Sequence, residues 1–167
     1  MTNPAGKHTS AKCAVQQTKI FEAIMTDNLK LEDRQLITDK LYNYSWTIDH
    51  NDVSGWLDTF TDDTFFKFGE LEIRGKENLG QWISSEVVGT LLNMRHIITN
   101  IMIEFEGENE ALSKSYWIFN SGHKEHKEEG VTENANGKYL MKWRSDKDGW
   151  QAYETMVEAV WWTGYNA

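Results

Sequence analysis

Residues 31–60 read LEDRQLITDK LYNYSWTIDH NDVSGWLDTF, and this stretch decides the fold class. Its apolar side chains recur at helical spacing, at Ile37, Leu41, Tyr44 and Ile48. A stripe of this kind is typical of a helix that faces a core, so one long helix is predicted from Leu31 to His50. Asp52 then stands at the N-cap position of a second, shorter helix over Val53–Phe60.

Downstream of this stretch the chain changes to β character. Thr64–Gly69 and Leu71–Gly75 predict a small hairpin, and Lys76–Val88 predicts a third helix. Four segments rich in Ile, Val, Tyr and Trp follow, at Arg95–Phe105, Ala111–Asn120, Gly137–Arg144 and Trp150–Trp162. We expect them to form an antiparallel meander, with the polar segment His123–Asn136 as a loose connection. The sequence therefore predicts an α+β domain.

The predicted strands carry apolar residues on both alternating faces. The first strand, for example, has Ile97 and Ile101 on one face and Ile98 and Met102 on the other. A sheet with one face in water would show cleaner alternation. We therefore expect helices or a cavity on one face, and another subunit of a homo-oligomer on the other.

Composition limits the classes of partner. A chain of 167 residues has the length of one domain, and eight tryptophans supply apolar area for a core or a pocket. The net charge of −9 repels phosphate backbones, and the lysines and arginines are scattered, so nucleic acid is discounted as a partner.

The sequence also bears on location and on the chain's ends. Cys13 is the single cysteine, which excludes an intramolecular disulfide. No apolar run approaches the roughly 18 residues of a membrane helix, and residues 1–17 lack the apolar centre of a secretory signal. We expect a cytoplasmic protein without membrane contact, with a mobile arm over residues 1–18 and one domain over residues 19–167.

Asp49 and His96 are the candidate catalytic pair. Asp49 lies beside Ile48 at the end of the first predicted helix, on a stripe with Tyr42 and Ser45 that borders the core. His96 opens an apolar strand, on the alternating face that also carries Ile98 and Asn100. Taken singly, a solvated carboxylate and a hydrogen-bonded core histidine are the plain interpretations. Taken together, a carboxylate on one imidazole nitrogen fixes the tautomer and frees the other nitrogen to take a proton.

A resemblance gives this pair a context. The run YSWTIDHNDVSGWLDTFTDD over Tyr44–Asp63, Arg74-Gly75, and MRHIITN over Met94–Asn100 together resemble the SnoaL-like branch of the NTF2-like superfamily. That branch includes scytalone dehydratase, bile-acid 7α-dehydratase, hexachlorocyclohexane dehydrochlorinase and the β subunits of ring-hydroxylating dioxygenases. The resemblance implies a cone of three N-terminal helices on a curved, mostly antiparallel sheet around a pocket, commonly assembled as a trimer.

The resemblance also implies roles for particular residues. Asp49 and His96 match the acid–base dyad of the dehydrochlorinase and the bile-acid enzyme, and Tyr44 matches the latter's pocket tyrosine. Trp46 resembles a pocket tryptophan of scytalone dehydratase, and Phe66 falls where the dehydrochlorinase has a pocket aromatic. Scytalone dehydratase has a second histidine one strand on, which His123 or His126 could supply. Residues also expected to contact a substrate are Tyr42, Asn100 and Trp117.

Some features depart from the family or stay open. Ala111–Asn120 has no carboxylate where the bile-acid enzyme carries a further pocket Asp. His123 and His126 also fit a charged surface turn, and with Glu125 they make only a weak metal site, so no metal is expected. Glu154 and Glu158 share one face of the last strand, as rim charges, intersubunit partners or a buried acid.

These observations predict a lyase that needs no cofactor and eliminates a leaving group from a hydrophobic, ring-containing small molecule. His96, oriented by Asp49, would remove the proton, and Tyr44 would donate a hydrogen bond to the leaving oxygen or a developing enolate. Isomerisation or cyclisation begins with the same proton abstraction. A ligand-binding protein or a dioxygenase β-like subunit is the alternative from another class.

Overall fold

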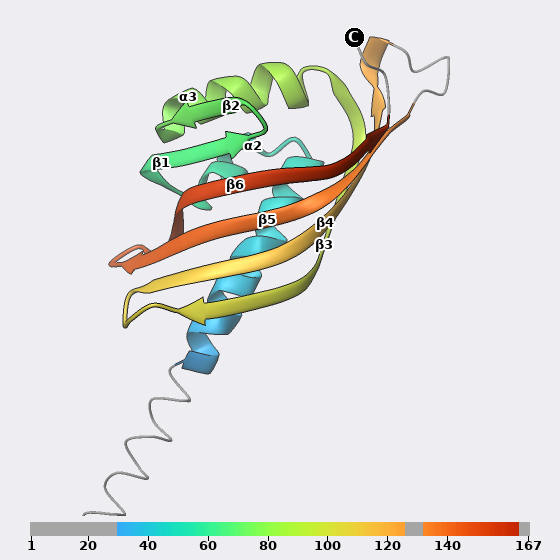
Figure 1. Cartoon of the computed structure of the whole chain (residues 1–167). Helices are drawn as coiled ribbons and strands as arrows, with labels where there is room; N and C mark the ends of the chain where they lie inside the picture. The colour runs from blue at the N-terminus through green and yellow to red at the C-terminus, as the bar shows by residue number, and fades with distance from the viewer. Residues whose placement is uncertain (1–29, 126–131, 164–167) are drawn as a thin grey trace, which may run out of the picture. The chain divides into compact units, whose positions relative to one another are not determined.

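The computed structural model describes residues 30–125 and 132–163. The chain divides into two compact units, Met1–Leu36 and Ile37–Ala167. In the first unit residues 30–36 are described, and they are helical. The sheet, its covering helices and the candidate site all belong to the second unit (Figure 1). The predicted arm over residues 1–18 and its boundary at residue 19 lie outside the described residues.

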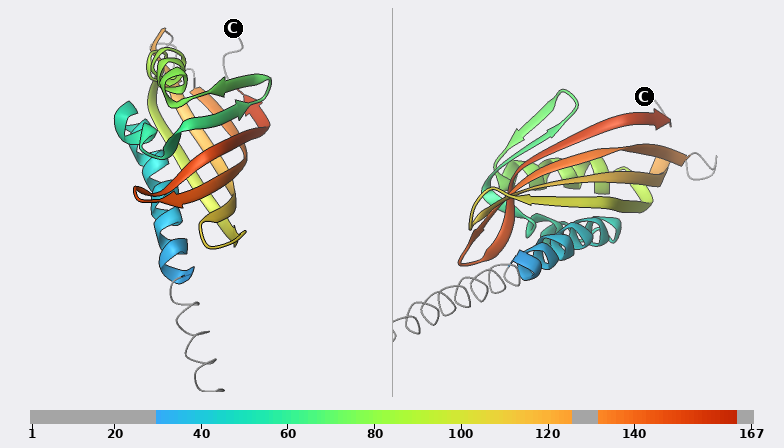
Figure 2. Two further views of the ribbon diagram at one scale, coloured as in Figure 1. Left: turned by 90° about the vertical axis from the view of Figure 1, so that its left-hand side faces the viewer. Right: turned by 60° about the horizontal axis from the view of Figure 1, so that its bottom comes forward.

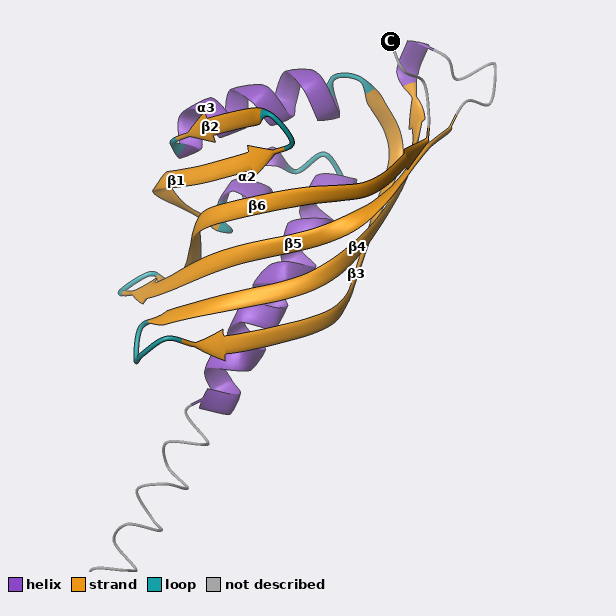
Figure 3. Cartoon of the chain, in the orientation of Figure 1, coloured by secondary structure: helices purple, strands orange, loops and turns teal. Residues whose placement is uncertain are grey.

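A six-stranded mixed sheet dominates the second unit (Figure 3). Its strands are β1 Phe60–Phe68, β2 Leu71–Arg74, β3 Leu91–Phe105, β4 Glu110–His123, β5 Thr132–Asp146 and β6 Gly149–Thr163. Their order across the sheet is β2-β1-β6-β5-β4-β3. Strand β1 pairs parallel with β6, and the remaining pairs are antiparallel. The predicted α+β class and the meander of β3 to β6 are confirmed.

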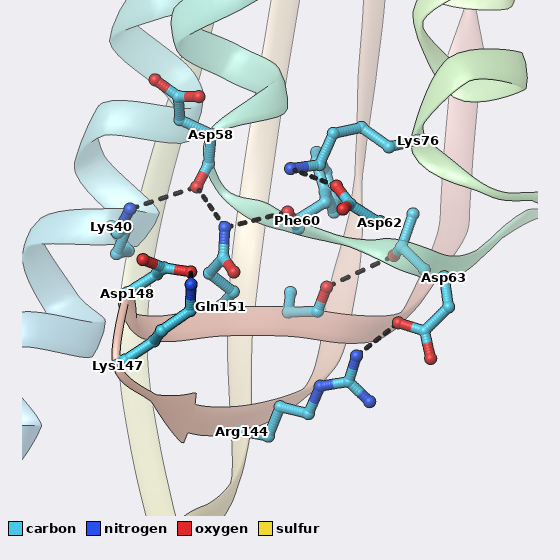
Figure 4. A network of polar contacts seen from close by, with 12 residues as sticks. Lys40, Asp58, Phe60, Asp62, Asp63, Lys76, Arg144, Lys147, Asp148 and Gln151 are labelled. Atoms are coloured by element: carbon cyan, nitrogen blue, oxygen red, sulfur yellow. Dashed lines mark hydrogen bonds and ion pairs between the residues drawn. The ribbon is translucent and has the colours of Figure 1, made fainter.

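The second helix and the hairpin differ from their predicted bounds. Helix α2 spans Val53–Leu57, and β1 already begins at Phe60. The polar run after Phe60 was expected to end the helix, but it lies within a strand: Thr61 is buried, while the carboxylates of Asp62 and Asp63 pair with Lys76 and Arg144 (Figure 4). The hairpin β1–β2 is therefore part of the main sheet, through the parallel pairing of β1 with β6.

The third helix and the polar connection also have new bounds. Helix α3, Lys76–Trp82, continues as the π-helical segment η1, Ile83–Val88, so the predicted helical span is confirmed while its second half is wound more loosely. The loose connection predicted over His123–Asn136 is wrong at both ends, because β4 reaches His123 and β5 starts at Thr132. At the start of β5 polar residues alternate with buried ones, as Asn134 does with Ala135.

The two faces of the sheet have different environments. Residues 37–49 of the first helix lie along one face (Figure 2), where Ile37 and Leu41 are fully buried in the core with the inward side chains of the strands. On the opposite face, Ile97, Ile118 and Trp161 lie in register on β3, β4 and β6 and are 52%, 44% and 51% exposed. One face of the sheet is thus covered by the chain's own first helix, and the other exposes apolar side chains to solvent.

Candidate active site

Asp49 is positioned by the way the first helix ends. The Asn51 and Asp52 N–H groups donate to the carbonyls of Ile48 and Thr47, at 3.0 and 2.9 Å, which closes a Schellman motif. Asn51 occupies its left-handed position, with a φ of 62°. Asp49 therefore lies in the last helical turn, where the helix dipole alone disfavours a carboxylate.

Asp52 links this end to helix α2. Its carboxylate accepts from the Gly55 N–H at 2.9 Å, which makes it the N-cap that the sequence predicts. A Cβ on Gly55 would contact the Asp52 carboxylate, which would then have to move from its capping position. The chain reverses within a few residues, and Trp56 of α2 is brought against Tyr44, with ring centroids 5.4 Å apart.

His96 meets Asp49 from strand β3. The Asp49 Oδ1 lies 2.7 Å from the imidazole Nδ1, and Oδ2 accepts from the His96 backbone N–H at 2.8 Å. A bulge with Asn93 at a φ of 52° interrupts the pairing of β3 and β4 just before His96. The backbone N–H and the imidazole of His96 thereby bind the same carboxylate. They replace water as the hydrogen-bond partners of Asp49.

The contact with Asp49 determines which nitrogen of the imidazole carries a proton. A carboxylate can only accept, so Nδ1 carries a proton, and in the neutral imidazole Nε2 then has the lone pair. Nε2 makes no hydrogen bond within the described residues, and His96 lines a cavity. The imidazole also packs against Phe119, with ring centroids 4.5 Å apart. The arrangement is an oriented base beside an apolar space.

The cavity has a volume of about 100 Å³ and a mainly apolar lining. Its lining side chains are Tyr44, Ile48, Trp56, Phe66, Phe68, Trp82, Ile83, Val87, Leu91, His96, Trp117, Phe119, Tyr139, Val157 and Trp162. The first helix, α2, α3, η1 and five strands of the sheet, all but β2, contribute to it. Among these lining residues the titratable ones are His96, Tyr44 and Tyr139.

Both tyrosines remain protonated at neutral pH. Burial raises the pKa of Tyr44 to about 12, although the neighbouring polar groups of Tyr139 and Trp56 partly offset the effect. Burial also raises the pKa of Tyr139 well above its usual range, and the neighbouring Tyr44 adds to this rise. The Asp49 carboxylate raises both further, because a negative charge opposes formation of a phenolate. Each phenol can therefore act as a hydrogen-bond donor.

The structure separates the predicted substrate-contacting residues into two groups. Phe66 and Trp117 are 3% exposed and line the cavity with Tyr44. Tyr42 and Trp46 are 53% and 68% exposed and lie outside the cavity, which corrects the expectation for both. Each is two residues from Tyr44, and two residues on a helix rotate a side chain about 200° to the opposite side.

Asn100 and His123 are also placed outside the cavity. A second bulge, with Asn100 at a φ of 55°, breaks the alternation that was expected to keep Asn100 on the face of His96. Asn100 is exposed there and accepts from the Thr99 hydroxyl at 2.9 Å. The His123 Nδ1 accepts from the Glu125 N–H at 3.3 Å at the end of β4, and His126 lies outside the described residues.

The structure also places Glu154 and Glu158. Glu154 and Glu158 pair with Lys142 and Lys138 across strands β5 and β6, at 2.9 and 3.7 Å. They are sheet-surface charges and do not line the cavity. No group of three or more His, Cys, Asp or Glu side chains able to hold a metal ion occurs in residues 30–125 and 132–163.

Sequence reasoning missed Tyr139, Trp56, Trp82 and Phe119 as cavity residues. A signal for Tyr139 was present: Tyr139, Met141 and Trp143 alternate with Lys138, Lys142 and Arg144, which marks one face of the strand as buried.

No helix in the described part of the chain is both long and apolar enough to cross a bilayer.

Comparisons with known proteins agree with this architecture. Residues 29–155 match the model of the SnoaL-like domain. A scytalone dehydratase-like protein from Novosphingobium aromaticivorans is 18% identical, with a TM-score of 0.75 over 84% of this chain and 92% of that one. A hexachlorocyclohexane dehydrochlorinase from Novosphingobium barchaimii is 15% identical, with a TM-score of 0.74 over 83% and 94%.

A third solved structure represents the wider superfamily. It is an NTF2-like protein from Salmonella enterica serovar Typhimurium, 18% identical, with a TM-score of 0.70 over 78% of this chain and 92% of that one. At such identities the likeness concerns the fold. No curated protein matches the sequence significantly.

Proposed function

Because the chain belongs to the SnoaL-like domain family, we propose that it is a lyase that eliminates a leaving group from a hydrophobic, ring-containing small molecule without a cofactor. The observation that carries the proposal is the His96–Asp49 pair, with Nδ1 bound to the carboxylate and the imidazole at the wall of an aromatic cavity. The flat aromatic lining suits a ring, and His96 is the basic side chain among the lining residues.

The proposed step is a proton transfer coupled to loss of a leaving group. His96 Nε2 takes a proton from a carbon next to an electron-withdrawing group, and the C–H electron pair forms a carbon–carbon double bond. The bond from the neighbouring carbon to its hydroxyl breaks, and this hydroxyl leaves as water after taking up the proton from His96. Tyr44 donates a hydrogen bond to the oxygen that gains charge.

Each residue has a separate part in this scheme. Asp49 stabilises the imidazolium that forms and holds the ring in one orientation, as in other His–Asp pairs. General base catalysis by a positioned histidine contributes roughly 10²–10⁴-fold. The apolar lining strengthens the Tyr44 hydrogen bond because little water competes for it.

We also infer that the chain has the cone shape of this fold around its pocket and that it forms a homo-oligomer, with a trimer favoured, which covers the second face of the sheet. The exposed apolar row of Ile97, Ile118 and Trp161 supports this inference, and Tyr116 beside it is 53% exposed. Asn136 of β5 lies between Ile118 and Trp161 in this row, and monomeric proteins rarely leave large apolar side chains gathered on one face in water.

The experiment that tests the function is a screen of hydroxylated ring compounds for dehydration, followed by the absorbance of the new conjugated double bond. The wild-type protein is compared with His96→Ala and with His50→Ala, a second histidine at an exposed position near the same helix end. We expect loss of turnover only in His96→Ala. Equal turnover in all three proteins would contradict the proposal, and binding without turnover in the wild type would favour the ligand-binding alternative.

A further inference from the structure

A second acidic side chain, Glu133, is buried beside the cavity. It lies near the start of β5 and is 8% exposed. In the antiparallel pairing with β4 it stands opposite Ser121, and two residues further along Ala135 stands opposite Phe119, which lines the cavity. Paired residues share a face of a sheet, and so do residues two apart on one strand. Glu133 therefore lies on the cavity face of the sheet.

Two cavity-lining aromatic residues are diagonal neighbours of Glu133. Ala135 pairs with Phe119 on one side and with Trp162 of β6 on the other, and both aromatic side chains line the cavity. Diagonal neighbours across strands are about 7–8 Å apart, within reach of a long side chain. Trp162 is 40% exposed, so the cavity approaches the surface here, where the end of β4, the start of β5 and the end of β6 lie together (Figure 1).

The polar groups of Glu133 and Ser121 are left without partners. The Ser121 hydroxyl is buried and makes no hydrogen bond. The Glu133 carboxyl forms no hydrogen bond or ion pair with another group in residues 30–125 and 132–163. Burial raises the pKa of this carboxyl, although the charge of His123 acts against the rise. Since buried polar groups in folded proteins are nearly always hydrogen-bonded, an acceptor without its donor lies beside the cavity.

We propose that Glu133 binds a hydroxyl group of the ligand, on the side of the ligand's ring that points away from His96. His96 pairs with Phe119, so Glu133 is two strands and two residues away from it, about 12 Å between backbones at ordinary sheet spacing. That separation leaves room for one ring between the two side chains. The inference rests on the proposed function only in that the cavity binds a ring-containing ligand, and it adds a second polar group to that ligand.

A hydroxyl is the donor that suits this place best. The Glu133 carboxyl accepts a hydrogen bond from a hydroxyl whether or not it is itself protonated. An ammonium group would have to give up its hydration beside the aromatic rings of Phe119 and Trp162, which costs much more than the transfer of a neutral hydroxyl. The ligand is therefore an amphipathic ring compound, with its reacting carbon at His96 and a hydroxyl at Glu133.

Two matched ring compounds test this inference without turnover. The probes are 2-phenylethanol and ethylbenzene, which differ by one hydroxyl at the end of the same arm. Calorimetry measures the binding of each to the wild type, to Glu133→Leu, which removes the acceptor, and to Glu133→Gln, which keeps one. The matched control is Glu158→Leu, because Glu158 pairs with Lys138 and does not line the cavity.

We expect Glu133→Leu to weaken binding of 2-phenylethanol about tenfold, the scale of one hydrogen bond, and to bind ethylbenzene no more weakly than the wild type does. Glu133→Gln should retain most of the affinity for 2-phenylethanol, since its amide oxygen still accepts. Glu158→Leu should bind both probes as the wild type does.

Unchanged binding of 2-phenylethanol by Glu133→Leu would overturn the inference. Equal weakening of both probes would also overturn it, because a merely structural role of Glu133 affects the whole cavity. If neither probe bound the wild type, the inference would fail together with the ring-binding cavity on which the proposed function depends. Since no reaction is involved, a negative dehydration screen with His96→Ala leaves these outcomes unaffected.

Discussion

Asp49 holds His96 through both of its carboxylate oxygens, one on the imidazole Nδ1 at 2.7 Å and one on the backbone N–H at 2.8 Å. The side chains of Asp49 and His96 are 8% and 14% exposed, so water competes little for either bond. The ring can neither flip nor translate along the strand without losing one of them. The predictions below follow from this relationship and from the elements that create it.

Asp49→Asn should lower kcat/KM by about 10²-fold or more. An amide that turns its oxygen to the His96 backbone presents its NH₂ group to Nδ1, which selects the wrong tautomer at Nε2. The measurement is turnover of the best compound from the screen. The control is Asp148→Asn, an exposed carboxylate that pairs loosely with Lys147 at 3.8 Å. Equal effects of the two substitutions would refute the role of Asp49.

Alkaline pH should destabilise the fold through Tyr44. Its folded pKa of about 12 lies above the unfolded value of 10.0, so the folded state holds its proton more tightly. Stability is therefore complete below pH 10 and falls as the pH rises from 10 to 12, by up to roughly 3 kcal/mol for a two-unit shift. Urea unfolding at pH 8 and 11 measures this loss. Tyr44→Phe should show a smaller loss than the wild type, and an unchanged loss would contradict the assignment.

The end of the first helix can be tested at Asn51. Its φ of 62° suits asparagine and glycine, whereas a β-branched side chain is strained there. Asn51→Val should lower the free energy of unfolding by about 1–2 kcal/mol, and Asn51→Gly should lower it by a few tenths at most. Urea denaturation of both variants decides the matter. Similar values for the two would show that the Schellman motif does not form.

Gly137 supports the wall of the cavity. A Cβ at this position would lie 1.7 Å from the Glu158 carbonyl oxygen, beside the bulge in the β5–β6 pairing. Gly137→Ala should therefore cost about 1–3 kcal/mol in urea unfolding and weaken ligand binding through Trp117. Gly122→Ala is the matched control, since its nearest neighbour atoms are 3.6 Å away. Tolerance of both substitutions would count against this packing.

The exposed sheet face can be tested by charge. Ile118 is 44% exposed in the apolar row, and a lysine there would place a charge inside any interface built on that row. Ile118→Lys should convert the oligomer to monomers in light scattering coupled to size exclusion. Lys114→Glu, on the same strand near its other end, is the control. A wild-type monomer would contradict the inferred assembly.

The sequence predicted the parts of this site that depend on regular periodicity. The helical spacing of Ile37, Leu41, Tyr44 and Ile48 correctly indicated the buried face of the first helix. Asp49 and His96 are 47 residues apart, and their contact was predicted from the resemblance and from the rule that buried polar groups form hydrogen bonds.

The remainder depends on local geometry that periodicity does not contain. The bulges at Asn93 and Asn100 shift the alternation of β3, so Asn100 leaves the face on which simple counting put it. Trp46 was carried over from a relative by motif, but its position two residues from Tyr44 turns it outward. The parallel pairing of β1 with β6 joins segments about 90 residues apart, and no local signal marks it.

The most direct test of the central claim is hydrogen exchange of a carbon acid in the cavity. Cyclic ketones with a hydroxyl on the β carbon are incubated in D₂O with the wild type or with His96→Gln, and proton NMR follows the C–H next to the carbonyl. The predicted result is exchange or dehydration with the wild type and at least 10²-fold slower reaction with His96→Gln. Equal rates with the two proteins would contradict the assignment of His96 as the base.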